Sequence, residues 1–127
     1  MTATVLVVDD SMLVRHTVCR WLEERGFQVE AVSNGAEALE AVERKTPDLI
    51  ITDLEMPRMT GSQLLSAVKS RPRSAHVPVV VLSSRQSARV VPLGRHPEYT
   101  IHKDIDIEQQ LERAVTAVLG DETVPRQ

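Results

Sequence analysis

Several side chains that could do chemistry come directly after short apolar runs of this 127-residue chain. They comprise acids, hydroxyls and an amine: Asp9, Asp10, Asp53, Ser83, Ser84 and Lys103. If the three aspartates converge to within about 5 Å, each pair repels by about 3 kcal/mol at an effective dielectric of about 20. A divalent cation would relieve this repulsion, and ligation by oxygen atoms with retained water is typical of Mg²⁺.

A metal ion, a lysine ammonium and a serine hydroxyl together would bind a group that carries several anionic oxygens, such as a phosphoryl group. One carboxylate could then act as the nucleophile and form an acyl phosphate. Each residue taken singly has an ordinary explanation as a helix cap, a turn residue or a surface charge. Their coincidence at the ends of several apolar runs favours the functional interpretation.

The apolar runs are typical of buried strands, because they are short, rich in β-branched residues and mostly lack polar alternation. The expected strands cover residues 4–8, 27–32, 49–52, 77–82 and 99–102, with the second nearer an edge of the sheet. Strands that alternate with helices predict a parallel sheet with helices on both faces and right-handed crossovers. In such a sheet the functional crevice lies at the carboxyl ends of the strands, where the polar residues stand.

Apolar residues at helical spacing lie between the expected strands. They predict a helix capped by Ser11 and ended by Gly26, and further helices over residues 36–45, 61–70 and 106–119. Asn34-Gly35 is predicted as a turn. Pro92, Gly94 and Pro97 leave room for about two helical turns at most after the fourth strand, so the helix there is expected to be short or irregular.

Composition narrows the classes of function. The chain has 15 Lys and Arg against 18 Asp and Glu, a formal net charge of −3, which argues against a strong electrostatic grip on nucleic acid. Cys19 is the only cysteine, which excludes an intramolecular disulfide and a thiolate metal cluster. The sequence has no apolar run of the roughly 20 residues that span a bilayer and no signal-peptide pattern, so we expect a cytoplasmic domain.

Four segments carry a resemblance to a known family. They are VLVVDDSMLVR at residues 5–15, PDLIITDLEMPRMTG at 47–61, PVVVLS at 78–83 and IHK at 101–103. Across residues 3–120 the sequence resembles the receiver domain of two-component response regulators. The resemblance implies a flavodoxin-like α/β fold with a doubly wound, five-stranded parallel sheet in the order 2-1-3-4-5. We expect a receiver domain over residues 1–120 and a tail or the start of a linker over residues 121–127.

The resemblance implies a metal site and a phosphoacceptor. Asp53 would accept the phosphoryl group and also contact Mg²⁺. Asp10 would be a direct Mg²⁺ ligand, Asp9 would act mostly through metal-bound water, and the backbone carbonyl of Glu55 would complete the protein ligands. The phosphoryl group itself would be bound by Lys103, by the switch hydroxyl of Ser83 and by the backbone N–H of Ser84.

The function implied is that of a signalling module rather than a turnover enzyme. A histidine kinase or phosphotransfer protein would supply the phosphoryl group, and the modified domain would change conformation to control a protein partner or a fused output domain. Dimerisation on phosphorylation is a further expected interaction. No direct contact with nucleic acid or membrane is expected.

Three features depart from the family pattern. Asp104 follows Lys103, where the family usually has proline. The segment between Ser83 and Lys103 is shorter than usual, which predicts an atypical output surface. Tyr99 lies one position before the usual aromatic switch residue, and a shift of one residue turns a side chain to the other face of a strand, so Tyr99 is expected to cover the sheet edge.

Three alternatives remain. A phosphatase of the haloacid dehalogenase type also uses an aspartate nucleophile and Mg²⁺, but its nucleophile follows the first strand and a second Asp lies two residues on, whereas Asp9 and Asp10 are adjacent. A receiver-like binding module that takes no phosphate is the second alternative. A flavodoxin-like redox protein is the third, and it is disfavoured because an acidic crevice would repel an anionic flavin phosphate.

Overall fold

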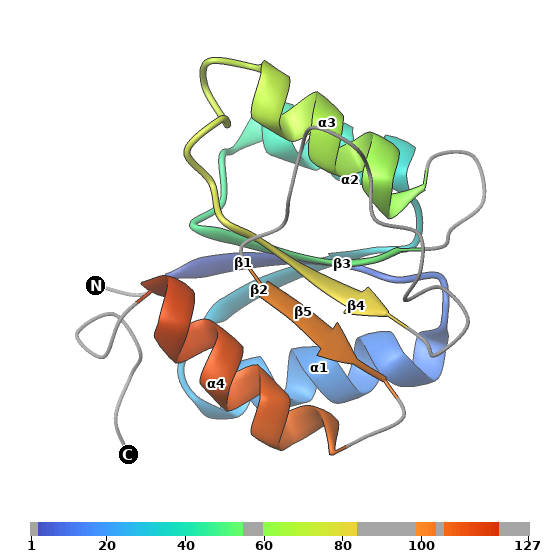
Figure 1. Ribbon diagram of the computed structural model, residues 1–127, viewed down its shortest axis with the longest axis vertical. Helices are drawn as coiled ribbons and strands as arrows, with labels where there is room; N and C mark the ends of the chain where they lie inside the picture. The colour runs from blue at the N-terminus through green and yellow to red at the C-terminus, as the bar shows by residue number, and fades with distance from the viewer. Residues whose placement is uncertain (1–2, 55–59, 84–98, 104–105, 120–127) are drawn as a thin grey trace.

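A computed structural model describes residues 3–54, 60–83, 99–103 and 106–119. Within these ranges, one parallel sheet lies between two layers of helices (Figure 1). The elements are β1 (Thr4–Val8), α1 (Met12–Glu24), β2 (Gln28–Val32), α2 (Gly35–Arg44), β3 (Leu49–Asp53), α3 (Gly61–Ser70), β4 (Val79–Ser83), β5 (Tyr99–His102) and α4 (Ile107–Leu119). Among the described residues, none of the helices has both the length and the apolar character of a membrane-spanning segment.

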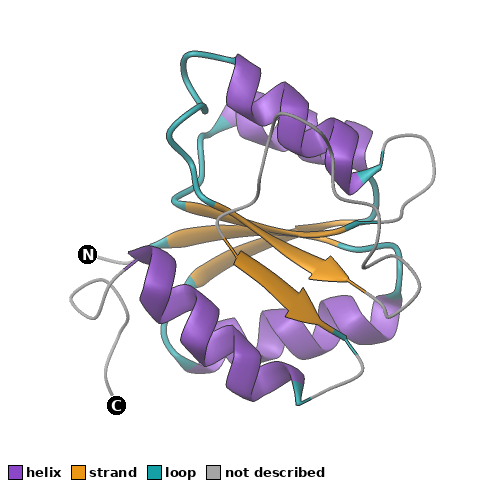
Figure 2. Cartoon of the chain, viewed as in Figure 1, coloured by secondary structure: helices purple, strands orange, loops and turns teal. Residues whose placement is uncertain are grey.

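The sheet has the order β2-β1-β3-β4-β5, and every neighbouring pair is parallel. This confirms the expected fold class, with β2 at one edge and β5 at the other. Figure 2 shows α2 and α3 on one face of the sheet and α1 and α4 on the opposite face. Because both faces are covered, the central strands β1, β3 and β4 are buried along almost their whole length.

The core consists of two apolar clusters, one on each side of the sheet. Alternate residues of β3 enter different clusters, since successive side chains of a strand point to opposite faces. Ile51 packs with the residues of α1 and α4, including Trp21 and Leu111. Ile50 packs with the residues of α2 and α3, including Leu65. The central strands are therefore fixed on both faces, which fixes the places where their carboxyl ends emerge.

The predicted helix signals at Ser11 and Gly26 are confirmed. The Ser11 hydroxyl accepts the Val14 N–H at 3.3 Å and caps α1, and Gly26 follows the end of that helix with a φ of 90°. The prediction of a turn at Asn34-Gly35 is wrong in its detail. Asn34 caps α2 by accepting the Glu37 N–H at 2.9 Å, and Gly35 is the first residue of that helix.

β1 and β5 have the predicted bounds, whereas the bounds of the other three strands differ from the expected ones by one or two residues. β3 includes Asp53, whereas β4 begins after Pro78 and includes Ser83. Tyr99 is half-buried against the cluster beneath α1 and α4, in keeping with its expected place at the sheet edge. The short helix expected after Ser83 and the tail expected over residues 121–127 lie outside the described residues.

Gly26 provides a test of the loop between α1 and β2. We expect Gly26→Ala to lower the free energy of unfolding by about 1 kcal/mol, because a side chain with a Cβ pays roughly 1–2 kcal/mol in the left-handed region. Gly26→Asn should cost less, since Asn enters that region more readily. Urea unfolding of the three proteins would measure both differences, and an Ala variant as stable as the wild type would contradict this account.

Candidate phosphoacceptor and metal site

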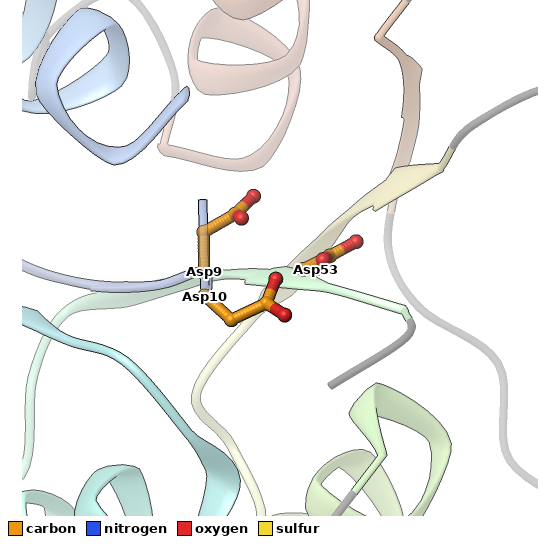
Figure 3. Close-up of side chains that lie close together, drawn as sticks. All are labelled: Asp9, Asp10 and Asp53. Carbon is orange, nitrogen blue, oxygen red and sulfur yellow. The ribbon is translucent and has the colours of Figure 1, made fainter. Parts of the chain in front are cut away.

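The acidic residues predicted to be functional meet at the carboxyl ends of two adjacent strands. Asp9 directly follows β1 and Asp53 ends β3, and these strands pair with Val8 opposite Thr52. One carboxylate oxygen from each of Asp9, Asp10 and Asp53 lies within 4.8 Å of the other two (Figure 3). Asp9 and Asp53 are 0% and 5% exposed, whereas Asp10 is exposed. The cluster therefore has a buried base and one side open to solvent.

Asp9 is held in place by the chain around it. Its N–H donates to the carbonyl of Val32 at 3.2 Å, and its Oδ1 accepts the Ser11 N–H at 2.8 Å. Its carbonyl oxygen accepts Nη1 of Arg15 at 2.7 Å. The turn that presents Asp9 and Asp10 is therefore tied both to β2 and to α1. Sequence reasoning gave no role to Arg15, because its partner is a backbone atom that the pattern of side chains does not reveal.

Lys103 reaches the same cluster from the end of β5. Its Nζ lies 2.9 Å from Asp53 Oδ1 and 3.1 Å from Asp9 Oδ2, so one ammonium bridges two of the acids. Burial alone would lower the pKa of Lys103, but the hydrogen bond to Asp53 and the charges of Asp9 and Asp53 outweigh it, and the pKa is raised. The ammonium is therefore charged throughout the physiological range of pH.

Ser83 lies at the end of β4, between the strand ends that carry Asp53 and Lys103. It is 2% exposed, and its carbonyl accepts the Lys103 N–H at 2.8 Å. The end of β3 is tied to β4 in the same way, since the N–H of Leu54 donates to the carbonyl of Leu82 at 3.0 Å. The structure thus brings the ends of β1, β3, β4 and β5 to one edge, as the sequence predicted. Glu55, Ser84 and Asp104 lie outside the described residues.

The residues present fit a divalent cation. The acids of the cluster outnumber the ammonium of Lys103, and their carboxylate oxygens are ligands that Mg²⁺ prefers. Asp9 Oδ2 is buried and, in the described part of the chain, has no hydrogen-bond partner, although Lys103 lies at ion-pair distance from it. Because a buried polar atom is normally hydrogen-bonded, this oxygen has capacity for a further ligand, either water or a metal-bound water.

Comparison with known proteins shows the family of this chain. The profile of the response regulator receiver domain family matches residues 5–115. The response regulator MprA of Mycobacterium leprae is 34% identical over 111 residues, which are 86% of this chain and 48% of that protein. The chain spans about half the length, or less, of the curated relatives it matches.

Solved structures are similar over nearly the whole chain. The chemotaxis response regulator CheY4 of Vibrio cholerae is 28% identical with a TM-score of 0.78, and the match covers 92% of this chain and 99% of that one. The receiver domain of a sensor histidine kinase from Pseudomonas aeruginosa has a TM-score of 0.85 over 95% of this chain and 100% of that one, at 19% identity, which shows the shared fold. With the profile match over residues 5–115, the sheet order and the acidic cluster, this chain belongs to the response regulator receiver domain family.

Proposed function

We propose that this receiver domain accepts a phosphoryl group on Asp53 and passes the signal on through a change of conformation. The observation that carries the proposal is the convergence of three carboxylates within 4.8 Å, with the Lys103 ammonium bridging Asp9 and Asp53. Like charges held close together at a partly buried site cost free energy, so the cluster needs a reason beyond stability. Binding and transfer of a phosphoryl group supply that reason.

In the proposed reaction, a carboxylate oxygen of Asp53 attacks the phosphorus of a phosphohistidine on a donor protein. A P–O bond forms and the P–N bond breaks, and its electron pair returns to the imidazole, which takes up a proton from solvent. Lys103 holds Asp53 Oδ1 at 2.9 Å before the reaction and so orients the nucleophile. Its ammonium then pairs with a phosphoryl oxygen and compensates the added charge.

The metal site of the proposal uses the same acids. Asp10 and Asp53 would hold Mg²⁺ directly and Asp9 would hold it through water, with the Glu55 carbonyl still a prediction. Bound there, Mg²⁺ would neutralise charge on the phosphoryl oxygens. The receiver domain from Pseudomonas aeruginosa, which shares this fold, has a magnesium ion coordinated in its active-site cleft. This supports the proposal that the present chain binds Mg²⁺.

The proposed switch starts at Ser83. A phosphoryl group on Asp53 adds about 1.5 to 2 negative charges at neutral pH, beside a strand end whose last side chain is a buried hydroxyl. The Ser83 hydroxyl and, by prediction, the Ser84 N–H would donate to it, and the segment after β4 would shift with them. This is a local electrostatic event that biases a two-state element.

The partners follow from the same proposal. A histidine kinase or phosphotransfer protein would be the donor, and a separate protein or an output domain fused after residue 120 would read the new conformation. We propose residues 1–120 as the receiver unit and a dimer that forms on phosphorylation as one mode of output.

The cytoplasm stays the predicted compartment. Such a domain is labelled once per molecule and does not turn over phosphate esters as a phosphatase does.

Labelling tests the assignment of Asp53. With acetyl phosphate and Mg²⁺, the wild type should gain the mass of one phosphoryl group, and Asp53→Asn should gain none, because the amide is not a nucleophile. Glu40→Gln on α2 removes one exposed acid that is not part of the cluster, and this variant should be labelled like the wild type. Intact-protein mass spectrometry would measure all three. Labelling of Asp53→Asn at the wild-type level would place the phosphoacceptor elsewhere.

Calorimetry tests the metal site. Asp10→Asn should weaken Mg²⁺ binding by about tenfold or more, since loss of one anionic ligand costs at least about 1.4 kcal/mol. In the absence of Mg²⁺ the same variant should unfold at an equal or higher urea concentration, because one source of repulsion has gone. An unchanged Mg²⁺ affinity would show that Asp10 is not a ligand.

Lys103→Met tests the balance of charge in the cluster. Without Mg²⁺ the variant should lose about 2 kcal/mol of unfolding free energy, because buried Asp9 and Asp53 lose their counter-ion. Mg²⁺ should restore more stability to the variant than it adds to the wild type, since the cation then supplies the missing positive charge.

The difference in unfolding free energy between the wild type and Lys103→Met should depend on pH with a defined sign. Because the pKa of Lys103 is raised by folding, its contribution should be constant at pH values well below the ordinary lysine pKa of 10.5. The stabilisation by Lys103 should be lost as the pH rises above 10.5 and through the raised pKa of Lys103. Urea unfolding of both proteins from pH 7 upward would measure the difference, and a gap that widens with rising pH would contradict the ion-pair assignment.

A further inference from the structure

The side chain of Gln110, in the first turns of α4, binds the backbone of the last residue of β5. Its Nε2 donates to the carbonyl of His102 at 2.7 Å, and its Oε1 accepts the His102 N–H at 2.9 Å. Both ends of one amide thus satisfy both backbone groups of one residue. Figure 1 shows α4 and β5 side by side at this edge of the sheet.

The geometry of a parallel strand explains why His102 needs such a partner. The Lys103 N–H points into the sheet, where it donates to Ser83 at 2.8 Å. Backbone groups of successive residues in a strand point to opposite sides, so those of His102 point away from β4, toward the open edge. The Gln110 amide takes the place that a neighbouring strand would occupy at this one residue.

This contact lies immediately before the functional lysine. Lys103 has a long side chain with four rotatable bonds, so the position of its ammonium depends on where the backbone at the end of β5 is held. On the inner side that backbone is held by Ser83, and on the outer side, one residue earlier, by Gln110. The ammonium then reaches Asp53 Oδ1 and Asp9 Oδ2 at 2.9 Å and 3.1 Å.

Capping of α4 does not account for the contact. Asp106 precedes the helix, and its Oδ1 accepts the Gln109 N–H at 3.3 Å. Its carbonyl accepts the Gln110 N–H at 3.3 Å and is approached by Gln110 Nε2 at 3.4 Å. The start of the helix therefore has its own side-chain cap, and the shorter bonds of the Gln110 amide go to β5.

We infer that Gln110 is a positioning residue for phosphoryl acceptance: its amide fixes the end of β5 so that Lys103 stands between Asp9 and Asp53. The inference rests on the proposed function, since it assigns Gln110 a part in the same reaction. It also ties α4 to the site, because Gln110 is hydrogen-bonded to His102 and His102 directly precedes Lys103 in the chain.

The test compares Gln110→Met with Gln109→Met. Methionine keeps the length and the helix propensity of glutamine and removes the amide. Gln109 is the exposed neighbour on the same helix, so Gln109→Met is a matched control for the substitution. The measured quantity is the rate constant for labelling of Asp53 by acetyl phosphate at saturating Mg²⁺, together with amide hydrogen exchange at His102.

We expect Gln110→Met to lower the labelling rate constant by about tenfold, because a displaced ammonium no longer orients Asp53. Exchange at His102 should become faster while exchange in β1 and β3 stays slow, which would show that the protein is folded. Gln109→Met should behave like the wild type in both measurements. In a Lys103→Met background, Gln110→Met should have no further effect on the rate, since its action passes through Lys103.

Two results would overturn the inference while the proposed function stands. One is a wild-type labelling rate in Gln110→Met. The other is an equal loss of rate on adding Gln110→Met to Lys103→Met, which would mean that Gln110 acts independently of the lysine. A wild type that takes no label at all would instead overturn the proposed function, and the inference with it.

Discussion

The repulsion among three carboxylates is the constraint on which the site depends. Asp9 and Asp53 are buried, so water screens their charges poorly, and the Lys103 ammonium stands between them. The arrangement persists because the rest of the domain fixes the strand ends. A parallel sheet with both faces covered cannot spread its strands to separate the acids without opening two apolar clusters. The energy of the core thus maintains a charge arrangement that would not form on its own.

The three acids differ in the way they are held, and this division would suit the entry and release of the proposed Mg²⁺. Asp9 is fixed by three hydrogen bonds: its N–H donates to β2, its side chain accepts from the Ser11 N–H, and its carbonyl accepts from Arg15. Asp10 is exposed, so it can exchange water for a ligand at little cost. The exposure of Asp53 lies between those of Asp9 and Asp10, and Lys103 holds one of its oxygens. A rigid base with one open side combines preorganisation with access.

Lys103 also connects the acidic site to the layer of helices that covers the sheet. The strand that carries it is the last of the sheet, and an edge strand has only one neighbour to hold it. The amide of Gln110 supplies a second attachment at His102, from a helix that itself packs on the core through Leu111. The position of the ammonium therefore depends on α4 as well as on β4. The ion pairs to the acids and the hydrogen bonds to this helix are therefore made by two adjacent residues of the chain, Lys103 and His102.

The sequence alone determined the sheet, its strand order through the family resemblance, and the strand ends where Asp9, Asp53 and Lys103 meet. These follow from local patterns, because apolar runs report burial and the polar residue after each run reports the edge where parallel strands end. Only the tertiary structure revealed Arg15 and Gln110. Both side chains bind backbone atoms, which every residue possesses, so the pattern of side chains along the sequence does not reveal which residue they bind. Their contacts depend on the register of the strands and on how each helix lies against the sheet, and these are set by packing over the whole domain.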